Sequence, residues 1–267
     1  MHNRKGLAAM KNLFSLEGRT ALVTGGSRGI GKMIAAGFIA HGAKVYISSR
    51  KAEACETAAK ELSAGGGTCI PLPVDVSSVA GAKALAAAYG KHEAKLDILV
   101  NNAGAAWLEK FDAFPEKGWD KVMDLNVKAP FFLTQALHGP LREAARAERP
   151  SKVINIVSID GIAVNPQETY SYAASKAGLI HLTKRMSLTL INDNIVVSAI
   201  APGAFASDMN VDARDKGSDV AKRIPSKRIG TDEDMAGAAI YLASRAGDYV
   251  VGATVVVDGG VSLSRVQ

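Results

Sequence analysis

The sequence has little of what marks secreted, metal-binding or membrane proteins. Only two of its 267 residues are cysteines, Cys55 and Cys69, and their spacing is not that of a metal site. We therefore expect no bound metal and a reducing, cytoplasmic setting. The longest apolar runs have the length of a β-strand, and the first residues do not resemble a signal peptide. We expect neither a membrane span nor secretion.

Charge of one sign is not concentrated anywhere either. The net charge is +6, but lysine and arginine are spread along the chain without a dense cluster or interleaved aromatic residues. This pattern is typical of a basic, well-solvated surface, and we do not expect a nucleic-acid partner.

A regular alternation of short β-branched runs and Ala-rich helical stretches is present instead. Residues 1–17 lack a clear period and are expected to form a flexible N-terminal arm. Residues 18–267 contain seven strand-like runs, apolar on both faces, and six helices, of which a long one is expected over about 119–146. No linker or repeat divides them. The pattern predicts one α/β domain, a Rossmann-type doubly wound sheet of seven parallel strands flanked by helices.

A candidate catalytic pair lies in residues 158–176, SIDGIAVNPQETYSYAASK. Tyr172 and Lys176 are four residues apart, so on a helix they share a face, and the ammonium would favour ionisation of the phenol. Ser158, at the end of an apolar run, would add a hydroxyl. Together these groups suit proton transfer at a carbonyl or alcohol oxygen. Taken alone, such a pair is more often packing beside a solvated charge.

A glycine-rich turn follows the first predicted strand. It contains Gly25, Ser27, Arg28, Ile30 and Gly31 and opens a helix. Glycines allow the backbone to approach a pyrophosphate, which free N–H groups at the helix N-terminus would bind. At this place in a βαβ unit, the turn predicts a dinucleotide site.

The end of the second strand distinguishes the two nicotinamide cofactors. NAD-binding proteins place a carboxylate there for the ribose 2′-hydroxyl, whereas this chain has Ser49 and Arg50. Arg50, with Arg28 opposite, could hold the 2′-phosphate of NADP. The alternative is that Arg50 is a solvated charge at a helix start. The missing carboxylate and the added cations both favour NADP(H).

Further polar or small residues end the third and fourth strands. Asp75 and Val76 could meet the adenine ring, and Asn102, Ala103 and Gly104 place small residues where backbone must pass close to a cofactor. Asn126, a polar residue within an apolar helical stretch, needs partners if buried. A structural role for Asn126 is as compatible with the sequence as a catalytic one.

These motifs together resemble the short-chain dehydrogenase/reductase family, of the non-extended type, over residues 16–260. The family's glycine motif matches residues 24–31, its NNAG motif residues 101–104, and its catalytic tetrad Asn126, Ser158, Tyr172 and Lys176.

The resemblance implies a role for each matched residue. Tyr172 would be the proton donor, Ser158 would hydrogen-bond the reacting oxygen, and Lys176 would lower the pKa of Tyr172 and hold the nicotinamide ribose. Asn126 would keep a water that links Lys176 to solvent. After the sixth strand, the resemblance implies that Pro202, Gly203 and Phe205 line the nicotinamide side, and that Ser207 contacts its carboxamide.

Within the family the chain is most similar to NADPH-dependent 3-oxoacyl-thioester reductases, including those that supply 3-hydroxyacyl chains for glycolipid synthesis. GRTALVTGGSRGIGKMIA and RIGTDEDMAG carry this similarity. The resemblance also implies a homotetramer, built from the two longest helices and the last strand.

Three alternatives stay open. Acyl carrier protein could be a partner, with Arg149 at one expected docking position, but Asp193 reverses the charge at the other and leaves a CoA thioester, a small ketone or a sugar open. A sugar or polyol dehydrogenase, of the gluconate or glucose type, is the alternative enzyme. A non-catalytic NADP-binding scaffold is a third hypothesis, and it predicts a damaged tetrad, whereas all four positions are intact.

Overall fold

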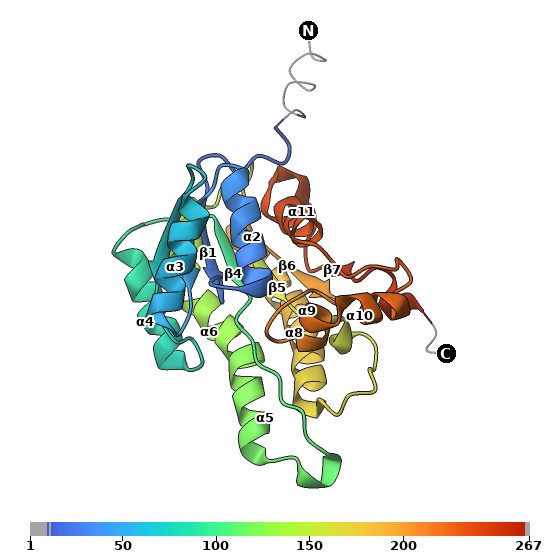
Figure 1. Cartoon of the computed structure of the whole chain (residues 1–267). Coiled ribbons are helices and arrows are strands. Elements are labelled where there is room, and N and C mark those ends of the chain that lie inside the picture. Colours follow the sequence, from blue (N-terminus) through green and yellow to red (C-terminus); the bar gives the residue numbers. More distant parts are fainter. Residues whose placement is uncertain (1–9, 11, 265–267) are drawn as a thin grey trace.

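The computed structural model describes residue 10 and residues 12–264 and shows a central sheet with helices on both sides (Figure 1). All seven strands are parallel and follow the order β3-β2-β1-β4-β5-β6-β7. This is the predicted doubly wound sheet. The strands are β1 (Thr20–Thr24), β2 (Lys44–Ser48), β3 (Thr68–Leu72), β4 (Ile98–Asn101), β5 (Ser151–Ile156), β6 (Ile195–Pro202) and β7 (Thr254–Val257).

The strand order reverses between β1 and β4, which are neighbours in the sheet although two strands separate them in the sequence. Chain leaving β1 turns toward β2, and chain leaving β4 turns toward β5. In such sheets a crevice forms beyond the carboxyl ends of the strands at this point. The glycine turn after β1 and the NNAG segment after β4 therefore lie side by side.

One face of the sheet is covered by α2 (Gly29–Ala40), α3 (Ala52–Ser63) and α11 (Asp232–Ala243). Alternate residues of the strands, such as Val23, Val45 and Ile154, bury their side chains against these helices in one continuous apolar core. The first turn of α11 is fixed by a capping box, in which Thr231 and Asp234 each accept a hydrogen bond from the other's backbone N–H.

The opposite face is covered by α4 (Val79–Gly90), α6 (Ala129–Ala136) and α8 (Tyr170–Leu190), and α5 (Glu116–Met123) packs against α8. The remaining strand side chains, such as Leu22, Leu99 and Val153, form the second core there. In Figure 1, α5 and the segment that precedes it extend below the sheet, alongside the start of α8. α8 is the longest helix described, and none of the described helices is both long and apolar enough to cross a membrane.

The prediction of one continuous helix over 119–146 is wrong, because four helical segments occupy this region. α5 begins at Glu116, a π-helical turn follows over Asp124–Lys128, and α6 is separated at Leu137 from α7 (His138–Ala144). Two prolines explain the interruptions. Pro130 and Pro140 have no N–H to donate to the carbonyl four residues earlier, so the regular α-helical hydrogen bonding is interrupted just before each proline.

The boundary predicted for the N-terminal arm is also too late. Residues 1–9 and 11 lie outside the described residues, but Leu16 is fully buried in the first core, and its N–H donates to the carbonyl of His41 at 2.9 Å. The packed domain therefore includes Leu16, which was assigned to the arm.

The chain between β6 and α11 contains two short helices, α9 (Val211–Asp215) and α10 (Gly217–Arg223). They lie beyond the carboxyl end of β6, next to β7, at the right of Figure 1. We call residues 204–225 the lid segment.

Candidate active site

The glycine turn after β1 is shaped by close approaches that only glycine permits. Gly25 has a φ of +66°, and a Cβ on Gly31 would lie 2.4 Å from the Gly25 carbonyl oxygen and 2.5 Å from Nδ2 of Asn102. The turn leads into α2, whose first turn holds no acidic residue and whose N-cap residue, Arg28, supplies no capping side chain. The N–H groups of this turn thus have no side-chain acceptor, and the site fits a phosphate group.

Thr24 joins this turn to the NNAG segment. Its buried hydroxyl donates to the Val100 carbonyl at 3.3 Å and accepts from the N–H groups of Asn102 and Ala103, each at 3.0 Å. The Asn102 side chain donates in return to the Thr24 carbonyl at 2.8 Å. Sequence reasoning included Thr24 in a motif but not among the site residues. Its position at the end of a buried strand, beside the glycine turn, was the signal.

The predicted pair of cations for the 2′-phosphate is not assembled in this structure. Arg50 is exposed just beyond β2, next to Ser49, whose hydroxyl donates to the Lys51 carbonyl at 3.1 Å. Arg28 forms an ion pair with Asp208 of the lid segment. Both arginines are exposed, so burial does not fix either side chain in its present rotamer.

Two residues after β3 have different environments. Asp75 is exposed, and its carboxylate accepts from the Ser77 N–H at 2.9 Å, while Val76 is buried in the second core. The Asp75 carboxylate keeps one oxygen free for a ligand, whereas Val76 can offer its backbone.

The four predicted catalytic residues come together at the ends of β4 and β5. Lys176 is buried on α8, and its Nζ donates to the Ile156 carbonyl at 2.9 Å and lies 5.5 Å from the centre of the Tyr172 ring. Ser158 is buried just after β5, where its hydroxyl accepts from the Asp160 N–H at 3.1 Å and acts on the pKa of the nearby Tyr172 phenol. Gly104 lies between Lys176 and Asn126. A Cβ on Gly104 would be 3.7 Å from Nζ of Lys176 and 3.3 Å from Oδ1 of Asn126.

Burial controls the pKa values of both ionisable groups in this cluster. It raises the pKa of the Tyr172 phenol to about 12, an effect that the hydrogen bond with Ser158 partly opposes. It lowers the pKa of Lys176 to about 8, partly opposed by the charge of Asp160. The expectation that Lys176 brings the pKa of Tyr172 below its usual value is therefore wrong for this structure. At neutral pH the phenol carries its proton.

Asn126 is held in a fixed orientation by three hydrogen bonds. Its Oδ1 accepts from the Ala105 N–H at 2.8 Å, and its Nδ2 donates to the Ala105 carbonyl and to the Ser175 hydroxyl, both at 2.9 Å. The side chain thus clamps the chain that leaves β4, and Ser175, which sequence reasoning missed, joins that clamp to α8. The π-helical turn places Asn126 here, four residues before Pro130.

The chain after β6 passes close to the glycine turn. Pro202 is buried, Gly203 donates its N–H to the Val257 carbonyl at 2.9 Å, and Ser207 lies 3.2 Å from where a Cβ on Gly29 would be. Phe205 is only 2% exposed, and its ring covers Gly230. The ring therefore faces the protein interior, and the backbone is the part of Phe205 that is free to line the nicotinamide side.

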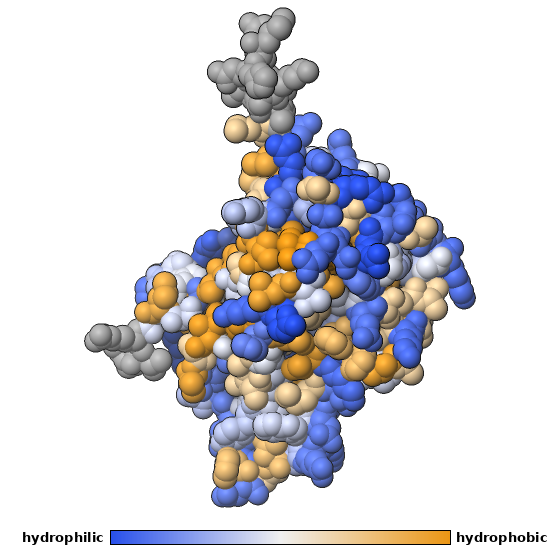
Figure 2. Space-filling model, turned by 180° about the vertical axis from the view of Figure 1, so that it is seen from behind, coloured by the Kyte–Doolittle hydropathy of each residue, from blue (hydrophilic) through white to orange (hydrophobic). Residues whose placement is uncertain are grey.

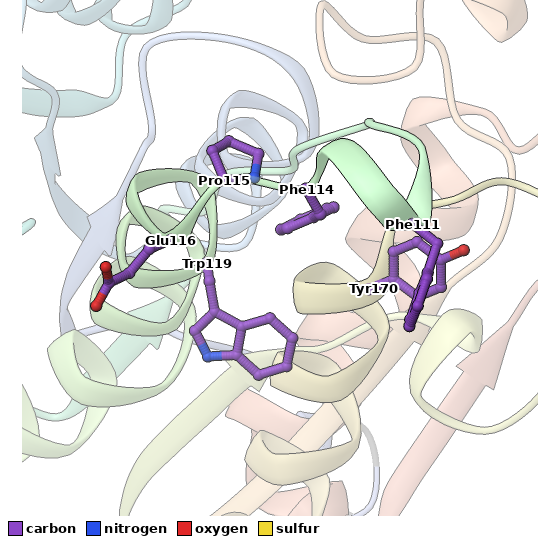
Figure 3. Close-up of a pocket in the computed structure, with 6 residues that line it drawn as sticks. All are labelled: Phe111, Phe114, Pro115, Glu116, Trp119 and Tyr170. Carbon is purple, nitrogen blue, oxygen red and sulfur yellow. The ribbon is translucent and has the colours of Figure 1, made fainter.

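A cavity of about 580 Å³ lies between the short helix at Phe111–Ala113, α5 and the start of α8 (Figure 3). Successive residues of a helix point about 100° apart, so Tyr170, in the cavity wall, faces away from Tyr172 and Lys176. The cavity is therefore not part of the catalytic cluster. It is lined by Phe111, Phe114, Pro115, Glu116, Trp119 and Tyr170.

Comparison with known proteins identifies close relatives. Residues 25–262 match the family model described as "Enoyl-(Acyl carrier protein) reductase". A curated protein of Pseudomonas aeruginosa, "Rhamnolipids biosynthesis 3-oxoacyl-[acyl-carrier-protein] reductase", is 47% identical over 258 residues, covering 95% of this chain and 100% of that protein.

A solved structure and a more distant relative extend this comparison. The structure described as "Pseudomonas aeruginosa RhlG/NADP active-site complex" superimposes with a TM-score of 0.91 at 47% identity, covering 94% of this chain and 99% of that one. The "2-dehydro-3-deoxy-D-gluconate 5-dehydrogenase" of Dickeya dadantii is 37% identical over 93% of this chain and 97% of its own length.

Proposed function

Because this chain belongs to the short-chain dehydrogenase/reductase family, we propose that it is an NADPH-dependent carbonyl reductase whose substrate is a 3-oxoacyl thioester. The observation that carries the proposal is the convergence of Ser158, Tyr172 and Lys176 at the carboxyl edge of the sheet, where the strand order reverses. The glycine turn with its free helix N-terminus lies at the same edge.

The protein's part in the reaction follows from these groups. Tyr172, whose phenol is protonated at neutral pH, donates its proton to the carbonyl oxygen of the substrate. Ser158 donates a hydrogen bond to the same oxygen and stabilises the negative charge that develops there. Lys176, fixed by the Ile156 carbonyl, holds a positive charge beside the Tyr172 ring, which favours loss of the phenol proton.

The bound cofactor would supply the hydride. The glycine turn, the NNAG segment and the Pro202-Gly203 segment would hold it, with Arg28 and Arg50 toward the 2′-phosphate. NADP is supported by the absence of a carboxylate directly after β2 and by the similar solved structure, which is described as an NADP complex. Asn126 positions the chain after β4.

A 3-oxoacyl thioester is supported by the 47% identical relative, whose name specifies that reaction. The alternative, a sugar acid, is supported by the 37% identical gluconate-type relative. The carrier of the thioester, CoA or acyl carrier protein, also belongs to the proposal. Asp193 hydrogen-bonds His138 at 2.9 Å and pairs with Arg142 at 3.5 Å. The Arg142 guanidinium offsets its negative charge, so Asp193 is a weaker obstacle to an acidic carrier protein than the sequence alone indicates.

Assembly and location are also part of the proposal. We propose a homotetramer, because large apolar side chains are exposed on α8 and around β7. We propose a cytoplasmic location, because Cys55 and Cys69 are both buried and unbonded.

The test is the initial rate of NADPH and of NADH oxidation with acetoacetyl-CoA, for the wild type and for Tyr172→Phe. We expect turnover that prefers NADPH and falls at least about 100-fold in the variant, as is typical when a general acid is removed. Tyr170→Phe, two residues away on another helix face, is the matched control and should retain full activity. Oxidation of gluconate with NADP in preference to thioester reduction would replace our substrate assignment with the alternative.

A further inference from the structure

Asp208 lies at the centre of a small ionic network between the lid segment and the glycine turn. One carboxylate oxygen pairs with Arg28, the residue before α2, and the other accepts from Nη1 of Arg214 on α9 at 2.7 Å. Arg214 is also bound to Asp215 through two hydrogen bonds of 2.8 and 3.1 Å. Both arginines lower the pKa of Asp208, so the carboxylate is ionised at neutral pH.

The lid segment also touches the turn at this point. Ser207 lies within 3.2 Å of the position of a Cβ on Gly29, and its hydroxyl accepts from the Asn210 N–H at 3.1 Å. Asn210 in turn caps α9, accepting from the Ala213 N–H at 3.1 Å. The backbone from Ser207 to α9 is therefore braced, and the Arg28–Asp208 pair joins this braced unit to the turn that would receive the cofactor phosphates.

Arg28 thus has two competing anionic partners. In this structure it is paired with Asp208, whereas in the NADPH complex of our proposed function it would be drawn to the 2′-phosphate. That phosphate carries up to two negative charges and presents more acceptor oxygens than a carboxylate, and it would repel Asp208 if both were close.

Resting on that function, we propose that Asp208 competes with the cofactor 2′-phosphate for Arg28, so that binding of NADPH releases residues 207–215 from the glycine turn. Asp208 is then a residue that sets cofactor selectivity without contacting the cofactor. Its removal should strengthen NADPH binding, because Arg28 would no longer have to leave a carboxylate.

The test compares Asp208→Asn with Asp215→Asn. Both variants remove one negative charge from the same stretch of the lid segment and both take a partner from Arg214, but only the first frees Arg28. We expect the Kd of NADPH, measured by fluorescence titration, to fall about two- to fivefold in Asp208→Asn, the range of an exposed ion pair. The Kd of NADH in Asp208→Asn and both Kd values in Asp215→Asn should stay at the wild-type values.

A second readout follows the lid segment itself through trypsin cleavage at residues 214–223. In the wild type, 2′,5′-ADP should accelerate this cleavage and 5′-ADP should not, because only the first carries the 2′-phosphate. In Asp208→Asn, cleavage should be fast without either nucleotide.

Each outcome is decisive. An unchanged or weaker NADPH affinity in Asp208→Asn would show that Arg28 binds both anions at once and would overturn the inference. An equal gain in NADPH affinity in Asp215→Asn would show that the effect comes from net charge alone, and would also overturn the inference. Equal affinity of the wild type for NADH and NADPH would instead overturn the cofactor assignment in the proposed function, which is a separate failure.

Discussion

Tyr172 and Lys176 are held by the same helix face, yet burial moves their pKa values in opposite directions. It raises the pKa of the phenol to about 12 and lowers that of the ammonium to about 8, because burial disfavours the charged form of each. The consequence is a neutral proton donor beside a cation that can lose its charge near physiological pH.

The first prediction concerns this cation. Lys176 is charged below about pH 8 and neutral above it, while Tyr172 keeps its proton over the whole range. Because proton donation relies on the nearby positive charge, kcat/KM for ketone reduction should be constant below about pH 7 and fall as the pH rises through about 8. The measurement is a pH profile of kcat/KM between about pH 6 and 10, with NADPH saturating.

Arginine provides the matched control for that profile, since its pKa lies far above this range. Any residual activity of Lys176→Arg should show no decline around pH 8. A wild-type rate that stays constant to about pH 10 would contradict the assignment of the decline to Lys176.

Sequence alone predicted the residues of this cluster but not their environment. Spacing placed Tyr172 and Lys176 on one helix face, and the structure puts them there. The direction of the Tyr172 pKa shift was missed because it depends on burial by segments distant in sequence. Ser175 and Thr24 were missed for the same reason, since a serine or threonine becomes a positioning residue only through its partners. The burial of the Phe205 ring depends in the same way on a distant partner, because Gly230, which the ring covers, is 25 residues away.

At the scale of elements, the second prediction concerns the start of α2. In Gly31→Ala the new methyl would lie 2.4 Å from the Gly25 carbonyl oxygen, a backbone atom, and so would push the glycine turn away from the helix. We expect NADPH affinity to fall at least about tenfold, which is about 1.4 kcal/mol of binding free energy, in a fluorescence titration.

Gly237, on α11, is the matched control for this substitution. A Cβ there would meet no atom within 4 Å, so Gly237→Ala should leave NADPH affinity unchanged and stabilise the helix by up to about 1 kcal/mol. A Gly31→Ala protein that binds NADPH like the wild type would show that the turn adapts, against our interpretation of the site.

The third prediction concerns a buried amide pair that joins β4 and β5 to the helices of the second face. Asn155 accepts from Asn101 at 2.9 Å and donates to the Thr183 hydroxyl on α8 at 2.9 Å. Asn155→Ala leaves the Asn101 amide and the Thr183 hydroxyl without their bonds to Asn155. We expect the free energy of unfolding in urea to fall by about 2–4 kcal/mol. The exposed Asn192→Ala should change it by less than about 0.5 kcal/mol, and equal losses in the two variants would contradict the role of this pair.

Strands were easier to predict from the sequence than helices. Each strand is short and rich in apolar or β-branched residues, so its pattern is local, and all seven were placed correctly in the parallel sheet. The region predicted as one helix over 119–146 contains Pro130 and Pro140. Their missing N–H groups indicate interruptions, but the apolar periodicity favoured one continuous helix. Where a helix continues past such a proline depends on side-chain partners such as those of Asn126, which the sequence does not display.

At the scale of the whole molecule, apolar side chains remain exposed in two places. Figure 2 shows hydrophobic residues gathered across the middle of the face that is hidden in Figure 1. Leu188, near the end of α8, is 68% exposed, and Tyr249 and Leu263, on either side of β7, are 99% and 89% exposed. An exposed apolar area such as the one in Figure 2 often marks an interaction site, and we therefore propose a tetramer that buries these apolar regions.

The last prediction tests that assembly. A tetramer with two kinds of interface should separate into dimers when one of them is disrupted. Leu188→Glu places a charge at the α8 interface, and burying an unpaired charge costs far more than the lost leucine contact. In sedimentation velocity, the wild type should therefore run as a tetramer and Leu188→Glu as a dimer. Thr57→Glu, which adds the same charge to an exposed position of α3, should remain tetrameric. A wild-type monomer would contradict the proposed assembly, and a tetrameric Leu188→Glu protein would place the interface elsewhere than on the end of α8.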